Sequence, residues 1–295
     1  MNRSLATQSP NASARHKRKR NVALFPLVNG LVFVLFCLFI LLPLWKVLID
    51  SLDLTTGYGM KLWPERFGFE GYTSVFTNKS LYVPLLNSVV TTLSGTLLGL
   101  LLSTLGAYVL IQFDMPGRTF FAGILLFTMI FRGGMIPTYI VMKNFGLVNT
   151  LWAVILYPAI DIYNLVLMRN FFEGIPNSLL ESATLDGCTP MQVFYKIVLP
   201  LSKAALASIG LMFAVLYWND YTNYKLYITK ETLYNFQMKL RSIMMGSDLP
   251  SANNGATENT VQNAAVIIAI LPFLILYPFL QRYFVTGINI GAVKG

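Results

Sequence analysis

Long apolar runs separated by shorter polar connectors dominate the chain. Each run approaches or exceeds the roughly 20 residues that a helix needs to cross the hydrocarbon core of a bilayer. No stretch has the ten-residue alternation typical of membrane β-barrel strands. Because a backbone in lipid must satisfy its own hydrogen bonds, the pattern predicts an all-α, polytopic membrane helix bundle. Six transmembrane helices are expected, at about 24–48, 84–110, 119–141, 149–169, 204–222 and 262–281.

Small residues recur at spacings of three or four along the second predicted helix. They are Gly95, Gly99, Ser103 and Gly106. Such a stripe favours close helix packing. The pattern fits equally well a contact within one subunit and an interface between two subunits.

The charge distribution predicts how the bundle is oriented. Residues 1–23 form a basic tail whose Lys and Arg contribute +6 of the formal net charge of +9. Such a tail before an apolar segment favours the cytoplasmic side of a cell membrane. For the permease domain, 24–285, this places the connector 170–203 inside and the connector 223–261 outside. The C-terminal tail, 286–295, is then cytoplasmic, like the N-terminus.

Composition supports a membrane protein over other classes. Hydrophobic residues make up 55% of the chain and charged residues 12%, whereas soluble proteins are about a quarter charged. Nucleic-acid binding is the weaker reading of the basic charge, because most of it lies in the tail. The nearly uncharged stretch 22–49 is too long for a cleaved signal sequence, so it is a retained anchor. Cys37 and Cys188 indicate neither a disulfide framework nor a metal site, and no cofactor is expected.

The connector 170–203 has the most specific local pattern. Ser178 stands three residues before Glu181, a capping box that predicts the start of a short helix. Gly187 can end this helix, since glycine tolerates the left-handed conformation that follows a helix.

A second short helix is predicted directly afterwards. Thr189 is its expected cap, Pro190 its first residue and Gln192 the partner of the capping box. Pro200 is expected to stop it.

The first of these helices is amphipathic. Leu179, Leu180 and Ala183 form an apolar face with Gly187, and the polar residues are Glu181, Ser182 and Asp186. Docking into a groove of a partner protein is one interpretation of such a face. The alternative is a helix that lies on the membrane or on its own bundle.

The same connector resembles a known family. Its residues match the E-A-A, three residues, G, nine residues, I-x-L-P signature of ABC importer permeases, with Ser182 in place of the middle alanine. The matching positions are Glu181, Ser182, Ala183, Gly187, Ile197, Leu199 and Pro200. The resemblance covers most of the chain, including its ending QRYFVTGINIGAVKG. It is greatest to the carbohydrate-uptake permeases, the MalG-like group, and particularly to the LplC-like branch.

This resemblance implies a type I importer permease and a set of partners. The segment 177–190 would be a coupling helix docked into a cytoplasmic ATPase subunit, with Glu181 and Asp186 among the contact residues. A second, homologous permease, two ATPase subunits, an extracellular solute-binding protein and a carbohydrate substrate complete the expected system. The external loop would resemble a scoop that enters the binding protein, and the C-terminal tail would contact the ATPases. A solvated linker is the alternative for that loop.

Other chemistry is sparse. The chain has no phosphate loop, so a partner must hydrolyse ATP, and no nucleophile–base pair indicates an enzyme. Arg132 interrupts an apolar run and is a candidate pathway residue, with snorkelling to the outer interface as the alternative. A polar aromatic cluster suits sugar contacts, although an interfacial aromatic belt is the commoner meaning of such residues. It comprises Tyr217, Trp218, Asn219, Asp220 and Tyr221.

Two alternatives to a carbohydrate permease remain open from the sequence. The first is an ABC permease for another solute, such as amino acids or phosphate. The second is a non-transporting membrane scaffold or sensory subunit that uses its cytoplasmic helices to hold a signalling partner.

Overall fold

The computed structural model describes residues 12–55, 59, 61–112, 115–131, 133–246 and 255–291, with side chains described between Phe25 and Phe279. These residues form helices without a named strand, so the predicted all-helical fold is confirmed for this part of the chain. The helices are α1 (Ala12–Leu52), α2 (Glu70–Thr77), α3 (Lys79–Ile111), α4 (Arg118–Ile130), α5 (Met135–Asn144), α6 (Leu151–Ala159), α7 (Ile162–Glu173), α8 (Asn177–Leu185), α9 (Pro190–Val193), α10 (Leu199–Leu201), α11 (Lys203–Trp218), α12 (Thr222–Tyr227), α13 (Phe236–Met244) and α14 (Glu258–Gly291). A π-helical segment, Phe194–Val198, follows α9, and a 3₁₀ turn, Glu231–Leu233, precedes α13.

Three of these helices are long and apolar enough to cross a membrane unbroken. They are α1 from Phe25, α3, and α14 as far as Phe279. Three helix pairs are bent at a short break: α4 with α5, α6 with α7, and the 190–201 segment with α11. Among the described residues the spans therefore number three, or up to six if each bent pair is one span. The predicted helix at 149–169 is not continuous, because the chain leaves the helix at Ile160 and Asp161.

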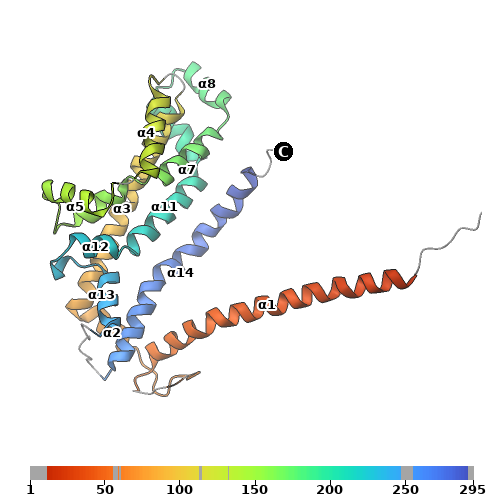
Figure 1. Ribbon diagram of the computed structural model, residues 1–295, viewed down its shortest axis with the longest axis vertical. Coiled ribbons are helices and arrows are strands. Elements are labelled where there is room, and N and C mark those ends of the chain that lie inside the picture. The colour runs from red at the N-terminus through yellow and green to blue at the C-terminus, as the bar shows by residue number, and fades with distance from the viewer. Residues whose placement is uncertain are drawn as a thin grey trace, which may run out of the picture.

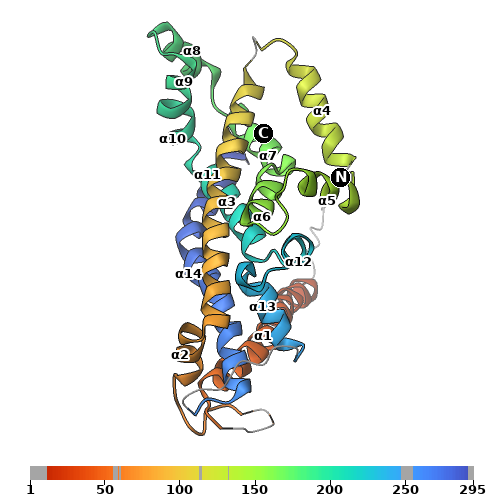
Figure 2. The same ribbon diagram turned by 90° about the vertical axis from the view of Figure 1, so that its left-hand side faces the viewer.

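Helix α3 is the centre of the bundle. It contacts α11, α7, α6 and α13, and Figure 2 shows these helices alongside it, with α8 and α2 at opposite ends of the long axis. The small-residue stripe packs within the chain. A Cβ at Gly95 would overlap the Tyr217 ring, and one at Gly99 would lie 2.7 Å from Phe213. Glycine at these positions lets α3 and α11 approach closely.

Helix α1 diverges from the rest of the bundle. It meets α14 near its C-terminal end and points away from it along most of its length (Figure 1). Its apolar side chains are largely exposed, as Phe39 illustrates at 80%. The end of α1 is fixed by the Thr260 hydroxyl of α14, which donates a 2.6 Å hydrogen bond to the carbonyl oxygen of Asp53.

Candidate functional site

The connector between α7 and α11 begins with α8, two residues earlier than a Ser178 cap would give. The predicted capping box of Ser178 and Glu181 is therefore wrong. Pro176 occupies the N-cap position, with φ −57° and ψ 127°, and makes no side-chain cap hydrogen bond. Because proline fixes φ, the chain is held extended at Pro176 and the helix starts directly after it.

Gly187 ends α8, as predicted. Its φ is +82°, its amide donates to the Thr184 carbonyl at 3.0 Å, and the Cys188 amide donates to the Ala183 carbonyl at 3.0 Å. These two bonds form a complete Schellman motif. A Cβ built on Gly187 would meet nothing within 4 Å. Within this chain the glycine is therefore needed for its backbone conformation and not for space.

The signature residues of α8 are presented on the surface. Glu181, Ser182, Asp186 and Gly187 are exposed. The predicted apolar face divides in two: Ala183 is 7% exposed and packs, with Leu180, on the bundle core, whereas Leu179 and Leu185 are exposed. Side chains of α8 thus attach it to its own bundle and leave its polar face accessible.

The second helix matches its predicted start and not its predicted end. Thr189 and Gln192 form the capping box with Pro190 at the first position. The chain stays helical past Pro200 and breaks at Ser202, where it bends by 81° into α11. Proline would clash with a carbonyl four residues earlier in a regular α-helix. The π-helical segment Phe194–Val198, directly before it, departs from that regular spacing.

Tyr108 connects this second helix to the bundle, and sequence reasoning missed it. Its hydroxyl donates a 2.7 Å hydrogen bond to the Pro190 carbonyl, and its ring lies 4.9 Å from that of Phe194. Ile197 and Leu199 pack against the same core, while Pro200 is exposed. A tyrosine at the end of an apolar helix carries no local signal that distinguishes such a contact from an interfacial position.

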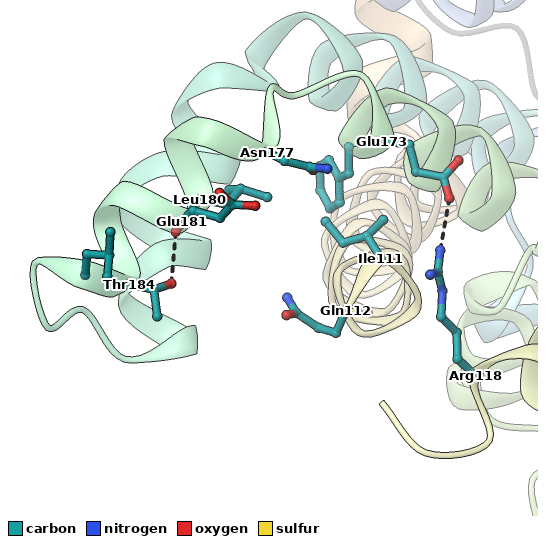
Figure 3. Close-up of a pocket in the computed structure, with 10 residues that line it drawn as sticks. Ile111, Gln112, Arg118, Glu173, Asn177, Leu180, Glu181 and Thr184 are labelled. Atoms are coloured by element: carbon teal, nitrogen blue, oxygen red, sulfur yellow. Dashed lines mark hydrogen bonds and ion pairs between the residues drawn. The ribbon is translucent and has the colours of Figure 1, made fainter. Parts of the chain in front are cut away.

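A cleft of about 920 Å³ lies between α8 and the adjoining ends of α3, α4 and α7 (Figure 3). Glu181 and Thr184 line it on the α8 side. On the opposite side Glu173 accepts from Arg169 at 2.8 Å and pairs with Arg118 at 3.4 Å. The pair with Arg118 ties α4 to α7 beside α8.

Two members of the predicted sugar-contact cluster lie inside the bundle. Tyr217 is 2% exposed and donates to the Ile155 carbonyl at 2.7 Å, and Trp218 is 5% exposed and donates to the Ala269 carbonyl at 2.9 Å. Their polar atoms are thereby satisfied within the chain. In this conformation they present neither a belt nor a surface for a sugar.

The other members of the cluster are more accessible. Asn219 is exposed and Asp220 is partly exposed. The Asp220 carboxylate accepts from the backbone and side-chain nitrogens of Asn223, each at 3.0 Å. The ring of Tyr221 lies 4.5 Å from the guanidinium of Arg241. Arg132 lies outside the described residues.

Within the segment 223–261, residues 223–246 pack against the rest of the bundle. The Asn149 side chain accepts from the Thr229 amide at 2.7 Å, and the Ser88 hydroxyl accepts from the Phe236 amide at 2.8 Å. Phe236 and Ile243 of α13 are each 1% exposed. Helix α13 therefore packs on α3 and α14. Its polar centre, 247–254, lies outside the described residues.

A charged network lies at the end of α1. The Asp53 carboxylate accepts from the Thr55 amide at 3.0 Å, the Arg66 amide at 3.2 Å and the Lys61 ammonium at 3.0 Å. Burial alone would raise the pKa of Asp53, but these hydrogen bonds outweigh it and hold the pKa well below its usual range. The hydrogen bond to Asp53 raises the pKa of Lys61. The network joins Asp53, directly after α1, to Lys61 and to the backbone of Arg66.

Comparisons with known proteins identify the family. The model of the binding-protein-dependent transport system inner membrane component family matches residues 12–290. The chain is 38% identical over 272 residues to the polygalacturonan/rhamnogalacturonan transport system permease protein YtcP of Bacillus subtilis, covering 90% of this chain and 95% of that one. It is 40% identical over 240 residues to protein LplC of the same organism, covering 79% and 81%.

A solved structure agrees. The crystal structure of a bacterial ABC transporter involved in the import of the acidic polysaccharide alginate superposes with a TM-score of 0.82 at 30% identity, covering 94% of this chain and 100% of that one. The family expected from the connector signature is confirmed. The chain therefore belongs to the inner membrane components of binding-protein-dependent transport systems.

Proposed function

We propose that this chain is one permease half of an ATP-driven importer for an oligosaccharide. The cargo class is supported by its relatives, whose names and descriptions refer to polygalacturonan, rhamnogalacturonan and alginate. The observation that carries the proposal is the exposed turn of α8, in which Glu181, Asp186 and Gly187 stand on a rigidly ended helix.

The full importer comprises a second, homologous permease, two ATPase subunits and an extracellular solute-binding protein. The α8 end of the long axis lies in the cytoplasm, with both termini, where it meets the ATPase. The α2 end lies outside. This orientation follows from the basic tail and the family signature.

Force enters the bundle through α8. ATP-driven closure of the two ATPases draws the coupling helices together. The packing of Ala183 on the core and the hydrogen bond from Tyr108 to Pro190 pass that displacement to α3 and α11. An exposed polar face on a helix with an anchored apolar side suits this task, because the partner can move it without unfolding it.

The outer segment 223–261 receives the binding protein. Its helices α12 and α13 are anchored by buried Tyr224, Tyr227 and Phe236, which gives a docked protein a firm surface. Asn219, Asp220 and Tyr221 adjoin this segment and remain pathway candidates together with Arg132. The C-terminal tail contacts the ATPases.

The experiment is reconstitution of the complete complex in lipid nanodiscs or vesicles with Glu181→Lys and Gly187→Leu. Both variants are expected to insert and to hydrolyse ATP at the basal rate of the ATPases. Their rates of cargo-stimulated ATP hydrolysis and of cargo uptake should fall at least tenfold. Ser182→Ala is the matched control, because it restores the commoner signature residue and keeps full activity. Intact uptake and coupled hydrolysis in both test variants would contradict the proposal. A panel of binding proteins loaded with oligosaccharides, amino acids or phosphate identifies the cargo.

A further inference from the structure

The span formed by α6 and α7 is broken near its middle. Helix α6 ends at Ala159 and α7 starts at Ile162, with a bend of 43° between them. Asp161 is ten residues after Leu151 and twelve before Glu173, the two ends of the span. Ile160 and Asp161 have ψ of 87° and 111°, so their backbone does not continue the helix. A break in the middle of a span that crosses the bilayer is expected near the membrane centre.

The surface around the break is exposed and partly polar. Ile160 is 63% exposed, Tyr163 53% and Tyr157 44%. Asp161 is partly exposed, and its carboxylate accepts the Asn164 amide at 2.8 Å, which caps α7. Within the described part of the chain, the Asn164 amide is the hydrogen-bond partner of the Asp161 side chain. The buried amide oxygen of Asn164, beside it, has no partner there.

Lipid cannot be what covers this surface. Irregular backbone at membrane depth is tolerated only where it is buried in protein or lines a water-filled cavity. A carboxylate at that depth faces the interior of a bundle or an aqueous pathway for the same reason. The exposed face of α6 and α7 therefore belongs to an interior that this chain does not close by itself.

The side chains at the break have the chemistry of saccharide recognition. Tyrosine rings offer flat apolar faces with a hydroxyl at one end. The carboxylate of Asp161 accepts hydrogen bonds, and sugar hydroxyls donate them. The negative charge of Asp161 favours hydroxyl donors and repels a carboxylate on the cargo.

We propose that Tyr157, Ile160, Asp161 and Tyr163 line the translocation pathway and that Asp161 binds hydroxyl groups of a neutral sugar unit as it passes. This assignment rests on the proposed function, because it names a contact of the same cargo. In the sequence of 149–169 the acidic Asp161 already distinguishes this face from lipid-facing positions. The broken helix and the exposure around it show which neighbouring side chains share the face.

Water accessibility tests the pathway without any cargo. In a background with Cys37 and Cys188 replaced by serine, Tyr163→Cys and Leu97→Cys are made in the full complex in nanodiscs. Leu97 is the matched control, since it is 68% exposed near the middle of α3 and begins the apolar run 97–102. A water-soluble maleimide labels Tyr163→Cys at least tenfold faster, because thiolates react in water. Equal, slow labelling of both cysteines would overturn the pathway assignment.

Cargo contact is tested separately. Saturating neutral oligosaccharide with its binding protein slows labelling of Tyr163→Cys. Asp161→Asn raises the KM for uptake of that oligosaccharide roughly three- to tenfold, and raises it less for a uronic-acid oligomer. Leu97→Ala leaves both unchanged. Fast labelling without cargo protection, together with an unchanged KM in Asp161→Asn, would overturn the sugar contact.

Failure of the proposed function would give a different set of results from failure of the pathway assignment. A wild-type complex that transports no oligosaccharide removes the function while the labelling difference between Tyr163→Cys and Leu97→Cys still stands. If Asp161→Asn does not insert, Tyr163→Phe supplies the uptake measurement. Loss of a phenol hydroxyl that contacts cargo raises KM, and an unchanged KM there counts against the contact.

Discussion

The Tyr108 hydroxyl of α3 lies 2.7 Å from the Pro190 carbonyl oxygen, joining the central helix of the bundle to the first residue of α9. The two residues are 82 positions apart in the chain. The bond anchors α9 on α3. In the proposed coupling, this bond would pass a movement of α8 and α9 to α3.

Replacement of Tyr108 by phenylalanine tests this link. The variant keeps the ring that packs on Phe194 and loses one hydrogen bond, a net cost of about 1 kcal/mol. We expect uptake per ATP hydrolysed to fall about fivefold in the reconstituted complex, with insertion unaffected. Tyr82→Phe, on the opposite end of α3, is the control and keeps the wild-type ratio. An unchanged ratio in Tyr108→Phe would show that the bond carries no coupling.

Substitutions at Gly187 should rank by backbone conformation. Its φ of +82° is strained for residues with a Cβ, by roughly 1–2 kcal/mol, and asparagine tolerates it best. Coupled ATP hydrolysis should therefore decrease from wild type through Gly187→Asn and Gly187→Ala to Gly187→Val. If Gly187→Ala and Gly187→Asn reduced coupled hydrolysis as much as Gly187→Val, the requirement for glycine would come from contact with the ATPase and not from the backbone turn.

Gly95→Ala should destabilise the protein, because the new methyl group overlaps the Tyr217 ring, which its hydrogen bond to Ile155 holds in place. Overpacking of this kind costs roughly 1–3 kcal/mol. A lower apparent Tm in detergent measures it. The matched control is Gly123→Ala in α4, where a Cβ meets nothing within 4 Å and helix propensity favours alanine. A Tm at or above the wild-type value is expected for that control, and the same result for Gly95→Ala would refute close packing here.

Asp53 should make stability depend on pH in the acidic range. Its pKa is lower in the folded protein than in the unfolded chain, where it is about 3.9. The charged form therefore stabilises the fold at pH values above the unfolded pKa, and this contribution is lost as the pH falls toward the folded pKa. We expect the difference in apparent Tm between wild type and Asp53→Asn to be full at pH 6 and to shrink below pH 4. A difference that stays constant with pH would exclude the carboxylate as its source.

Local patterns in the sequence predicted local structure where a few residues suffice to specify it. The capping box at Thr189 and Gln192 and the left-handed turn at Gly187 both formed as predicted. The capping box predicted at Ser178 did not form, because Pro176 imposes an earlier helix start. The S-x-x-E pattern does not include the residues that precede the serine. Such signals depend on dihedral angles and hydrogen bonds within one helical turn.

Contacts between distant segments were outside the reach of these patterns. Tyr217 and Trp218 resemble interfacial residues in sequence, yet both are buried with their polar atoms paired to carbonyls of α6 and α14. The contacts of residues 223–246 likewise follow no local pattern, yet Phe236 and Ile243 anchor this stretch in the bundle.

The sequence by itself determined that the chain is an all-helical membrane protein with the permease signature, because apolar length and glycine or proline positions act locally. Only the tertiary structure decided which faces those helices bury. It placed Tyr108 against Pro190, paired Asp53 with Lys61 and left the broken span at Asp161 exposed. Burial depends on the crossing of helices far apart in the chain, and a uniformly apolar helix carries no periodic mark of the side on which its neighbour will lie.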